Sequence, residues 1–340
     1  MAVVYLAERA DDDFHHQVAL KLLQTGVASD DVVRRFLRER QILAQSRHSG
    51  IAQLLDGGIT SDGQPYLVME YVDGLPIDQW ADERRLTVEE RLRLFLRVAR
   101  PVAYAHRNLV VHRDIKPSNI LVTAEGDVKL LDFGIAKLLD DEADATKSAL
   151  RAMTPAFASP EQILGTPITT ATDVYQLGML LYLLLTGRWP YRGGVASDAS
   201  LLMAICESPP VRPSSAVSSR KETEAAPGMV TLPPAELEGT RRMTTARLRR
   251  ELSGDIDTIV LTALRKEPER RYASVGQLIS DVERYLAGRT VSARPETIAY
   301  RLRKFVARHS VASAVAAMAI AAIVTIAALY TVRLEHCLLY

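Results

Sequence analysis

The positions of hydrophobic residues divide the chain into a region of short strands and a longer region of helices. Short apolar, β-branched runs at residues 3–7 and 17–23 flank a polar, Asp-rich turn and predict a hairpin. Two further runs, 51–59 and 64–71, flank a Ser-Asp-Gly turn and predict a second strand pair. Between the two pairs, apolar residues recur at helical spacing over 30–43. The first part of the chain is therefore predicted to be a β sheet with one helix.

After the second strand pair the hydrophobic pattern becomes helical. Thr87 and Glu90 have the spacing of a capping box, in which each side chain accepts a hydrogen bond from the other residue's backbone amide. They predict a helix over residues 88–107. Ser274 and Gln277 form a second box of this kind and predict another helix close to the end of the helical region.

One stretch of the helical region has a different composition. Proline, serine, glutamate and lysine are concentrated over residues 207–234. Such a composition favours irregular, solvated chain, because it offers little apolar surface to bury. We therefore predict a surface insertion over about residues 207–250.

Residues 311–332 form the longest apolar run and contain no charge, no Gly and no Pro. A helix of this length reaches about 33 Å, enough to cross a hydrocarbon core of roughly 30 Å. A buried core helix is the alternative, because alanine supplies much of the run. Basic residues dominate the preceding segment: Arg289, Arg294, Arg301, Arg303, Lys304 and Arg308. Since basic flanks stay cytoplasmic, the pattern predicts a single-pass membrane protein with residues 1–310 in the cytoplasm.

Composition and charge exclude several classes of protein. Apolar residues make up 48% and charged residues 24%, which is ordinary for a folded protein and excludes a disordered or collagen-like chain. A net charge of +1 argues against a surface devoted to nucleic acid. Two cysteines cannot form a disulfide framework or a thiolate zinc site, so a reducing compartment is expected for most of the chain.

Four short motifs carry the candidate chemistry. Residues 111–119 (VHRDIKPSN) lie between apolar runs and are expected to form a loop between strands, and an Asp-Phe-Gly motif follows at 132–134. Upstream is VALK at 18–21, and downstream is SPE at 159–161. Each motif alone is weak, but together and in this order they resemble the eukaryotic-like (Hanks-type) serine/threonine protein kinases of bacteria.

This resemblance implies an α+β, bilobal protein-kinase-like fold, and the apolar run adds a single transmembrane helix after it. A small β-rich lobe that lacks its first strand would cover residues 1–71, and a larger helical lobe with the insertion would cover 72–288. A basic juxtamembrane segment over 289–310, the membrane helix over 311–332 and a short tail over 333–340 would complete the chain.

The resemblance also assigns the residues of phosphoryl transfer. Asp114 would accept or orient the proton of the substrate hydroxyl, and Lys116 would neutralise the γ-phosphate. Lys21 would hold the α- and β-phosphates of ATP, with Glu39 as the carboxylate that aims it. For Glu39 taken alone, a solvated charge on a helix surface is the simpler reading, because arginines surround it.

The expected cofactors are ATP and Mg2+, with Mn2+ as an alternative ion. Asn119 and Asp132 would supply the hard oxygen ligands that magnesium prefers. The nucleotide pocket implied by the resemblance is lined by Val4, Ala19, Met69, Glu70 and Val72. Met69 would limit the depth of this pocket, although it is equally typical of the end of a buried strand.

Further residues are assigned to substrate selection, regulation and structure. Thr154 would help to select Ser or Thr acceptors, and Thr146 and Ser148 are candidate phosphorylation sites. The structural residues would be a buried ion pair and the aspartate that braces the loop at 111–119: Glu161, Arg271 and Asp173.

The start of the chain departs from the family pattern, because no glycine precedes Gly26 and Ala2 stands where the last glycine of a Gly-rich loop is expected. A truncated gene start is the favoured explanation.

The function expected is transfer of the γ-phosphate of ATP to Ser or Thr of proteins, with possible autophosphorylation, in signal transduction at the membrane. The expected partners are ATP, protein substrates and the lipid bilayer, with a second copy of the chain as a further candidate and no nucleic acid. A membrane-anchored pseudokinase or scaffold that binds nucleotide poorly is the alternative, and a small-molecule phosphotransferase of similar fold is a third possibility.

Overall fold

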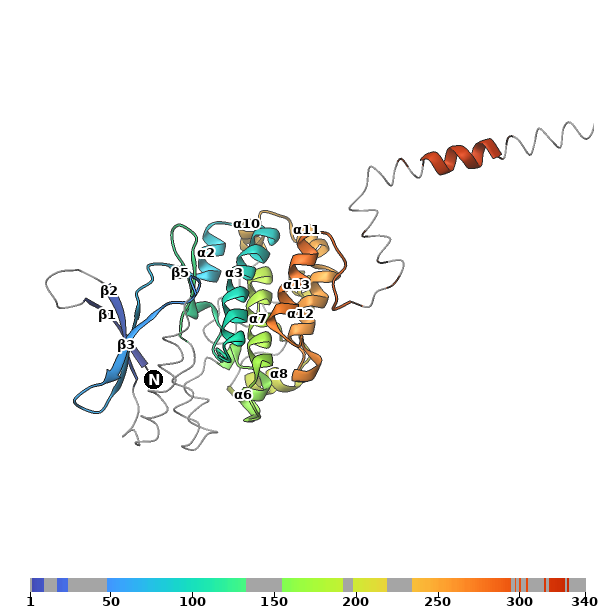
Figure 1. Cartoon of the computed structure of the whole chain (residues 1–340). Helices are drawn as coiled ribbons and strands as arrows, with labels where there is room; N and C mark the ends of the chain where they lie inside the picture. The colour runs from blue at the N-terminus through green and yellow to red at the C-terminus, as the bar shows by residue number, and fades with distance from the viewer. Residues whose placement is uncertain are drawn as a thin grey trace, which may run out of the picture. The chain divides into compact units, whose positions relative to one another are not determined.

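The computed structural model (Figure 1) describes two compact units, Met1–Val282 and Glu283–Tyr340. The described residues are 2–8, 17–23, 48–132, 155–191, 198–218, 234–294, 297, 300, 304, 315, 318–327 and 329. The first unit contains two sheets and the helices that build the candidate site, and the second is short.

Four antiparallel strands form the first sheet in the order β1-β2-β4-β3. They are β1 (Ala2–Glu8), β2 (Gln17–Leu23), β3 (Leu54–Ile59) and β4 (Pro65–Glu70). Both predicted strand pairs are confirmed, each as an antiparallel hairpin. The helix predicted over residues 30–43 lies outside the described residues.

A smaller sheet contains the strand that follows the candidate loop. Its order is β5-β6-β7, from β5 (Leu75–Pro76), β6 (Ile120–Val122) and β7 (Val128–Leu130), and the short 3-10 helix η1 (Pro117–Asn119) precedes β6. The backbone just before β3 reaches this sheet. The amide of Leu130 donates to the carbonyl of Gly50 at 2.9 Å, and the amide of Ala52 donates to the carbonyl of Leu130 at 3.0 Å. The two sheets are therefore joined by backbone hydrogen bonds.

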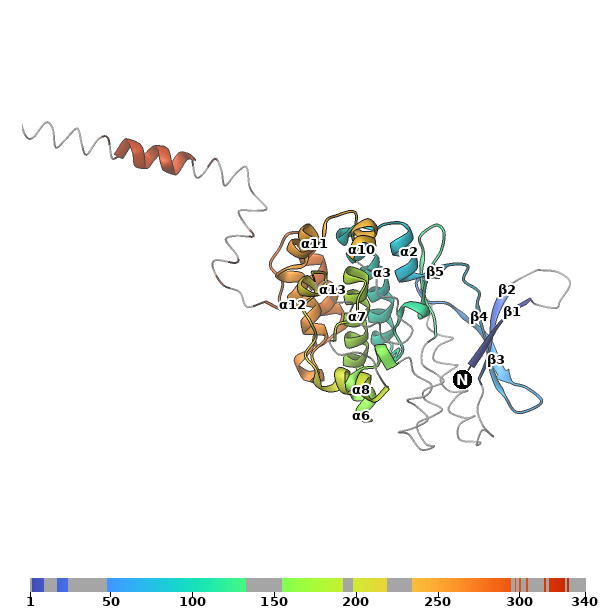
Figure 2. The same cartoon turned by 180° about the vertical axis from the view of Figure 1, so that it is seen from behind.

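The remainder of this unit is helical (Figures 1 and 2). Its described helices are α2 (Ile77–Glu83), α3 (Val88–Arg107), α6 (Pro160–Leu164), α7 (Thr170–Thr186), α8 (Asp198–Glu207), α9 (Pro213–Ala216), α10 (Pro234–Arg241), α11 (Thr245–Leu252), α12 (Asp255–Ala263) and the first part of α13 (Val275–Leu286), which continues past Val282. Two 3-10 helices, η2 (Pro155–Phe157) and η3 (Pro268–Arg270), lie between them. A β-rich part followed by a helical part is thus confirmed as the architecture.

Helix α7 is the core of the helical part, because every residue from Thr172 to Thr186 is buried. It contacts α3 and α12, so apolar residues are needed around its whole circumference. A Cβ added at Gly178 would lie 2.8 Å from the Cβ of Ala263, so glycine is what allows α7 and α12 to approach this closely.

The predicted capping box at the start of α3 is confirmed. The Glu90 amide donates to the Thr87 hydroxyl at 3.3 Å, and the Thr87 amide donates to the Glu90 carboxylate at 2.8 Å. The Thr87 amide and hydroxyl both donate to the Glu90 carboxylate, and these two hydrogen bonds lower the pKa of Glu90. The box at α13 differs in detail, because the Gln277 side chain accepts from the amide of Ala273, not from that of Ser274.

Two predictions differ from the structure. The loop at residues 111–119 follows helix α3, not a strand, so the apolar residues before it are the end of a helix and its connection. The stretch over 207–250 was predicted as a surface insertion, yet its described flanks include helices with buried side chains. Val217, Leu237 and Leu248 are each at most 1% exposed. These apolar residues pack into the core, whereas residues 219–233 lie outside the described part.

In the second unit, the described residues 318–327 are helical and expose apolar side chains. Met318, Ile323 and Ile326 are 65–66% exposed. Within the described ranges, no helix is both long and apolar enough to span a bilayer. Most residues of the 311–332 run that fall outside 318–327 also fall outside the described part.

Candidate active site

The loop at residues 111–119 is held to α7 by a buried aspartate. Asp173 is fully buried, and its carboxylate accepts hydrogen bonds from the amides of His112 and Arg113, each at 2.8 Å. His106, at the end of α3, places Nε2 2.7 Å from the same carboxylate. Arg113 has a φ of 67°, in the left-handed region that costs energy for a residue with a side chain. Asp173 therefore stabilises a strained turn immediately before Asp114.

His112 joins this loop to the strand that leads to Asp132. Its ring is fully buried, with Nε2 2.9 Å from the carbonyl of Leu131 and Nδ1 3.3 Å from the amide of Asp114. A carbonyl can only accept and an amide can only donate, so the imidazole is neutral with its proton on Nε2. Burial lowers its pKa, in agreement with this neutral state. This geometry gives His112 a structural role, in which its ring connects the loop to the strand that precedes Asp132.

Asp114 presents a partly exposed carboxylate whose direction is fixed by two neighbours. Its Oδ2 accepts from the Asn119 side-chain amide at 2.8 Å and lies 3.1 Å from Nζ of Lys116. The same Asn119 amide donates to the backbone carbonyl of Asp114 at 2.8 Å. The Asp114 side chain is 20% exposed. The structure therefore brings together the candidate base and its cationic neighbour at the protein surface.

The oxygen donors predicted for a metal lie on adjacent pieces of chain. The amide of Leu131 donates to the backbone carbonyl of Asn119 at 2.8 Å, which places Asp132 next to the end of the loop. Because the Asn119 side-chain nitrogen binds Asp114, its side-chain oxygen is directed elsewhere. An amide oxygen and a carboxylate fit Mg2+, which prefers hard oxygen ligands and keeps several of its positions for water and phosphate. No cluster of three or more His, Cys, Asp or Glu suited to a metal occurs in the described part of the chain.

Lys21 pairs with Asp132 in this structure. Its Nζ lies 2.7 Å from Oδ1 of Asp132, and the two side chains are 14% and 26% exposed. The predicted partner, Glu39, lies outside the described residues, so its pairing with Lys21 stays a prediction. The contact places the lysine of the four-stranded sheet beside the predicted metal ligand.

The strand register gathers the predicted nucleotide-pocket residues on one face of the four-stranded sheet. Ala19 is opposite Met69, and Lys21 is opposite Val4. Directly opposed residues of antiparallel strands point to the same face, as do residues two apart on one strand. Val4, Ala19, Lys21 and Met69 therefore share a face, and Val72 follows β4 as a buried residue.

Glu70 uses its side chain to connect the two sheets. One carboxylate oxygen lies 2.5 Å from Nζ of Lys129 on β7, and the other accepts from the amide of Gln53 at 3.1 Å. The backbone amide of Glu70 donates to the carbonyl of Gln53. Because the carboxylate and the amide of Glu70 are already bound, only its backbone carbonyl could accept a hydrogen bond from a nucleotide base.

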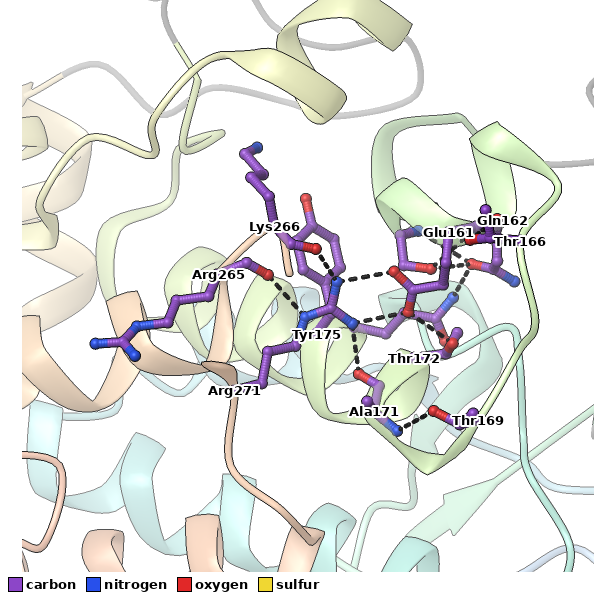
Figure 3. A network of polar contacts seen from close by, with 12 residues as sticks. Glu161, Gln162, Thr166, Thr169, Ala171, Thr172, Tyr175, Arg265, Lys266 and Arg271 are labelled. Carbon is purple, nitrogen blue, oxygen red and sulfur yellow. Dashed lines mark hydrogen bonds and ion pairs between the residues drawn. The ribbon is translucent and has the colours of Figure 1, made fainter. Parts of the chain in front are cut away.

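The ion pair of Glu161 and Arg271 is buried and fully hydrogen-bonded (Figure 3). Two parallel contacts of 2.7 and 2.8 Å join the carboxylate to the guanidinium, and the Thr172 hydroxyl donates to Glu161 at 2.7 Å. Burial acts to raise the pKa of Glu161, but the hydrogen bonds and charge of Arg271 outweigh it and the net pKa is lowered. Arg271 also binds three backbone carbonyls, those of Ala171, Arg265 and Lys266.

Some predicted residues lie outside the described part, and other residues were not predicted. Thr146, Ser148 and Thr154 fall among the undescribed residues. Conversely, Gln162 and Gln176 contact the loop, and His106 contacts Asp173, without having been singled out from the sequence. Their signal was weak, because a polar residue on a helix is most often solvent-exposed.

The family profile and the similar proteins that match this chain indicate the same family. The profile of the protein kinase domain matches residues 1–281. A probable serine/threonine-protein kinase of Streptomyces coelicolor is 34% identical over 299 residues, covering 86% of this chain and 39% of that protein. Serine/threonine-protein kinase PknB of Mycobacterium tuberculosis is 33% identical over 290 residues, covering 84% and 41%.

Serine/threonine-protein kinase PrkC of Bacillus subtilis is 39% identical over 212 residues, covering 62% of this chain and 32% of that protein. The chain thus spans about two fifths or less of the length of these relatives.

Proposed function

Because the chain belongs to the protein kinase family and carries a serine/threonine protein kinase domain, we propose that it transfers the γ-phosphate of MgATP to serine or threonine hydroxyls of proteins. The observation that carries this proposal is the Asp114 carboxylate, which Asn119 and Lys116 orient at a partly exposed position. Phosphoryl transfer needs positioning and charge compensation more than covalent chemistry, and this loop offers both.

In this proposal Asp114 accepts a hydrogen bond from the substrate hydroxyl and aligns it for attack on the γ-phosphorus. The proton of that hydroxyl moves toward the carboxylate as the new oxygen–phosphorus bond forms, while the bond between the γ-phosphorus and the β,γ-bridging oxygen breaks and ADP leaves. Lys116, whose Nζ lies 3.1 Å from the same carboxylate, would offset the negative charge of the γ-phosphate. Its contact with Asp114 also keeps the carboxylate directed to the surface.

Lys21 and the face of the four-stranded sheet that bears it would hold the nucleotide. Val4, Ala19 and Met69 share this face and would pack against the adenine and ribose. Asn119 and Asp132 would hold Mg2+, which would supply charge compensation on the phosphates. The Lys21–Asp132 contact of 2.7 Å keeps the phosphate-binding cation and the metal-binding carboxylate together.

The direct test is Asp114→Asn in the full chain, assayed by transfer of labelled phosphate from ATP to a generic basic protein. Loss of the base should lower the rate by about 10²- to 10⁴-fold. Asp127→Asn is the matched control, because Asp127 forms an exposed ion pair with Arg97 at 3.2 Å and should leave the rate unchanged. Transfer that persists in Asp114→Asn would overturn the assignment of the base.

Thermal unfolding with MgATP separates a kinase from a scaffold. A nucleotide at about 100 times its Kd should stabilise the folded chain by about 2.7 kcal/mol. No shift of the unfolding temperature at millimolar MgATP, together with no phosphate transfer, would favour the pseudokinase alternative.

Peptide mapping of autophosphorylated protein would test Thr146 and Ser148 as phosphorylation sites.

We also propose that residues 311–332 form a membrane helix, with residues 1–310 on the cytoplasmic side. The support is the uncharged sequence, the basic segment before it, and the exposed apolar side chains at 318–327. Val324→Arg should release the chain from membranes, since a central arginine costs about 2.5–3.5 kcal/mol on insertion scales. Chain that resists alkaline extraction equally in both forms, or that is soluble in both, would contradict the proposal.

A further inference from the structure

Gln176 of α7 binds the backbone on both sides of Asp114. Its Oε1 accepts from the amide of Ile115 at 2.9 Å, and its Nε2 donates to the carbonyl of Arg113 at 3.1 Å. The side chain is buried, with 1% of the residue exposed. One rigid, planar amide therefore fixes the peptide groups that precede and follow the candidate base.

Gln162 of α6 adds a second donor to the same carbonyl. Its Nε2 lies 2.8 Å from the carbonyl oxygen of Arg113, and its Oε1 accepts from Nε2 of Gln176 at 2.9 Å. The same Oε1 accepts from the amide of Ser159 at 3.0 Å, within the capping box of α6. Gln162 thus joins the start of α6, which follows η2, to the turn before Asp114.

These contacts complete the restraint on a strained turn. Asp173 holds the amide of Arg113, while the two glutamines hold its carbonyl, so both polar backbone groups of the residue with φ of 67° are bound. A residue in this conformation persists only where its surroundings determine it. The Gln176 amide uses one acceptor and two donor hydrogens in one plane, so aspartate, glutamate or an apolar residue cannot replace it without losing a contact.

We propose that Gln176 is a positioning residue for Asp114, and that Gln162 links this position to the segment at η2 and the start of α6. The proposal rests on the proposed function, in which Asp114 is the catalytic base. Loss of the glutamine amide should therefore affect the two kinetic constants differently. It should lower kcat, and it should leave KM for ATP unchanged because Gln176 does not contact the face of the four-stranded sheet that would bind the nucleotide.

The test compares Gln176→Glu, Gln176→Met and the control Gln277→Glu in the full chain. Gln176→Glu keeps the acceptor for Ile115 and loses both donors, whereas Gln176→Met keeps the volume and loses all three contacts. A displaced reacting group costs up to about 10²-fold, so we expect kcat to fall by about 10- to 100-fold, most in Gln176→Met. Gln277 is exposed at the start of α13, and Gln277→Glu should match the wild type.

A pH profile supplies a readout that simple loss of packing would not change. The carboxyl in Gln176→Glu would face the Arg113 carbonyl and the Gln162 oxygen in a buried site, which favours its protonated form. Protonation returns one donor to the Arg113 carbonyl. Lowering the pH from about 8 to about 6 should therefore raise kcat of Gln176→Glu relative to wild type, and should not do so for Gln176→Met.

Hydrogen exchange provides a measurement that does not depend on activity. The amide of Ile115 should exchange faster in Gln176→Met than in wild type, while exchange in Gln277→Glu stays the same. Unchanged exchange and unchanged kcat in folded Gln176→Met would overturn the proposal. Asp114→Asn, measured in parallel, distinguishes failure of the proposed function from failure of this proposal. Activity that survives in Asp114→Asn would contradict the role of Asp114 as the base. The exchange rate of the Ile115 amide would then still show whether Gln176 restrains the backbone around Asp114.

Discussion

The helical part and the four-stranded sheet hold their candidate site residues by different means. In the helical part, Asp173 and Gln176 of α7 are buried and bind the backbone of the loop at 111–119 directly. In the sheet, Lys21 and Glu70 reach the rest of the site through ion pairs that are partly exposed. Buried hydrogen bonds are costly to leave unmade, whereas partly exposed ion pairs exchange with water at little cost.

The helical part and the sheet therefore differ in how firmly they fix their site residues. The position of Asp114 is set by a dense, buried polar network, as a reacting group requires. Lys21, which we propose to hold the phosphates, is positioned by a partly exposed contact with Asp132.

The largest effect is expected from Glu161→Gln, which breaks the buried ion pair between Glu161 and Arg271. It leaves the buried Arg271 without a charged partner, and breaking a buried pair in this way costs about 3–5 kcal/mol of unfolding free energy. Urea unfolding of wild type and variant measures this cost. Glu89→Gln is the control, because Glu89 and Arg93 are 61% and 63% exposed and their pair should contribute at most about 0.5 kcal/mol. Equal costs for the two variants would remove the distinction between buried and exposed pairs.

A smaller effect is expected from pH. Burial lowers the pKa of His112 from its ordinary value of 6.5, so below that pH the unfolded chain binds a proton that the folded chain does not. Stability contributed by neutral His112 is therefore present above pH 6.5 and is lost as the pH falls, by at most about 1.4 kcal/mol per pH unit.

Urea unfolding of wild type and His112→Gln across this range measures the effect. Glutamine does not titrate, so the stability difference between the two proteins should shrink as the pH falls. Because the pKa of His48 is also lowered, only the difference between the two proteins isolates His112. Parallel stability curves would mean that His112 does not carry the pH dependence.

The smallest effect is expected at the link between the two sheets. Glu70→Gln removes the charge that pairs with Lys129, and because these side chains are 32% and 20% exposed the cost should be about 0.5–1 kcal/mol. The cost should shrink further between about 50 mM and about 500 mM salt, because the pair is partly screened. A salt-independent cost above about 2 kcal/mol would place this pair with the buried network instead.

Much of the local structure could be predicted from the sequence. The two strand pairs and the Thr87–Glu90 box follow from residues near one another in the chain, and these predictions are confirmed. The motif residues from Lys21 to Asp132 could be placed in one site because their order resembles a known family. No local pattern distinguishes Gln176 from any other helical glutamine.

The flanks of the predicted insertion show the same limit. Residues 234–250 are polar and highly charged, yet Leu237 and Leu248 are buried, because a few apolar residues at the right helical positions are sufficient to pack against neighbours distant in sequence.

The sequence by itself determined the two strand pairs of the first sheet, the start of α3 and the family, since these depend on short spacing and on residue identity. The tertiary structure alone decided which groups hold Asp114 in place, which tautomer His112 adopts and that Lys21 pairs with Asp132. The physical reason is that each of these depends on a donor and an acceptor brought within about 3 Å from positions far apart in the chain, and only the folded packing sets that distance.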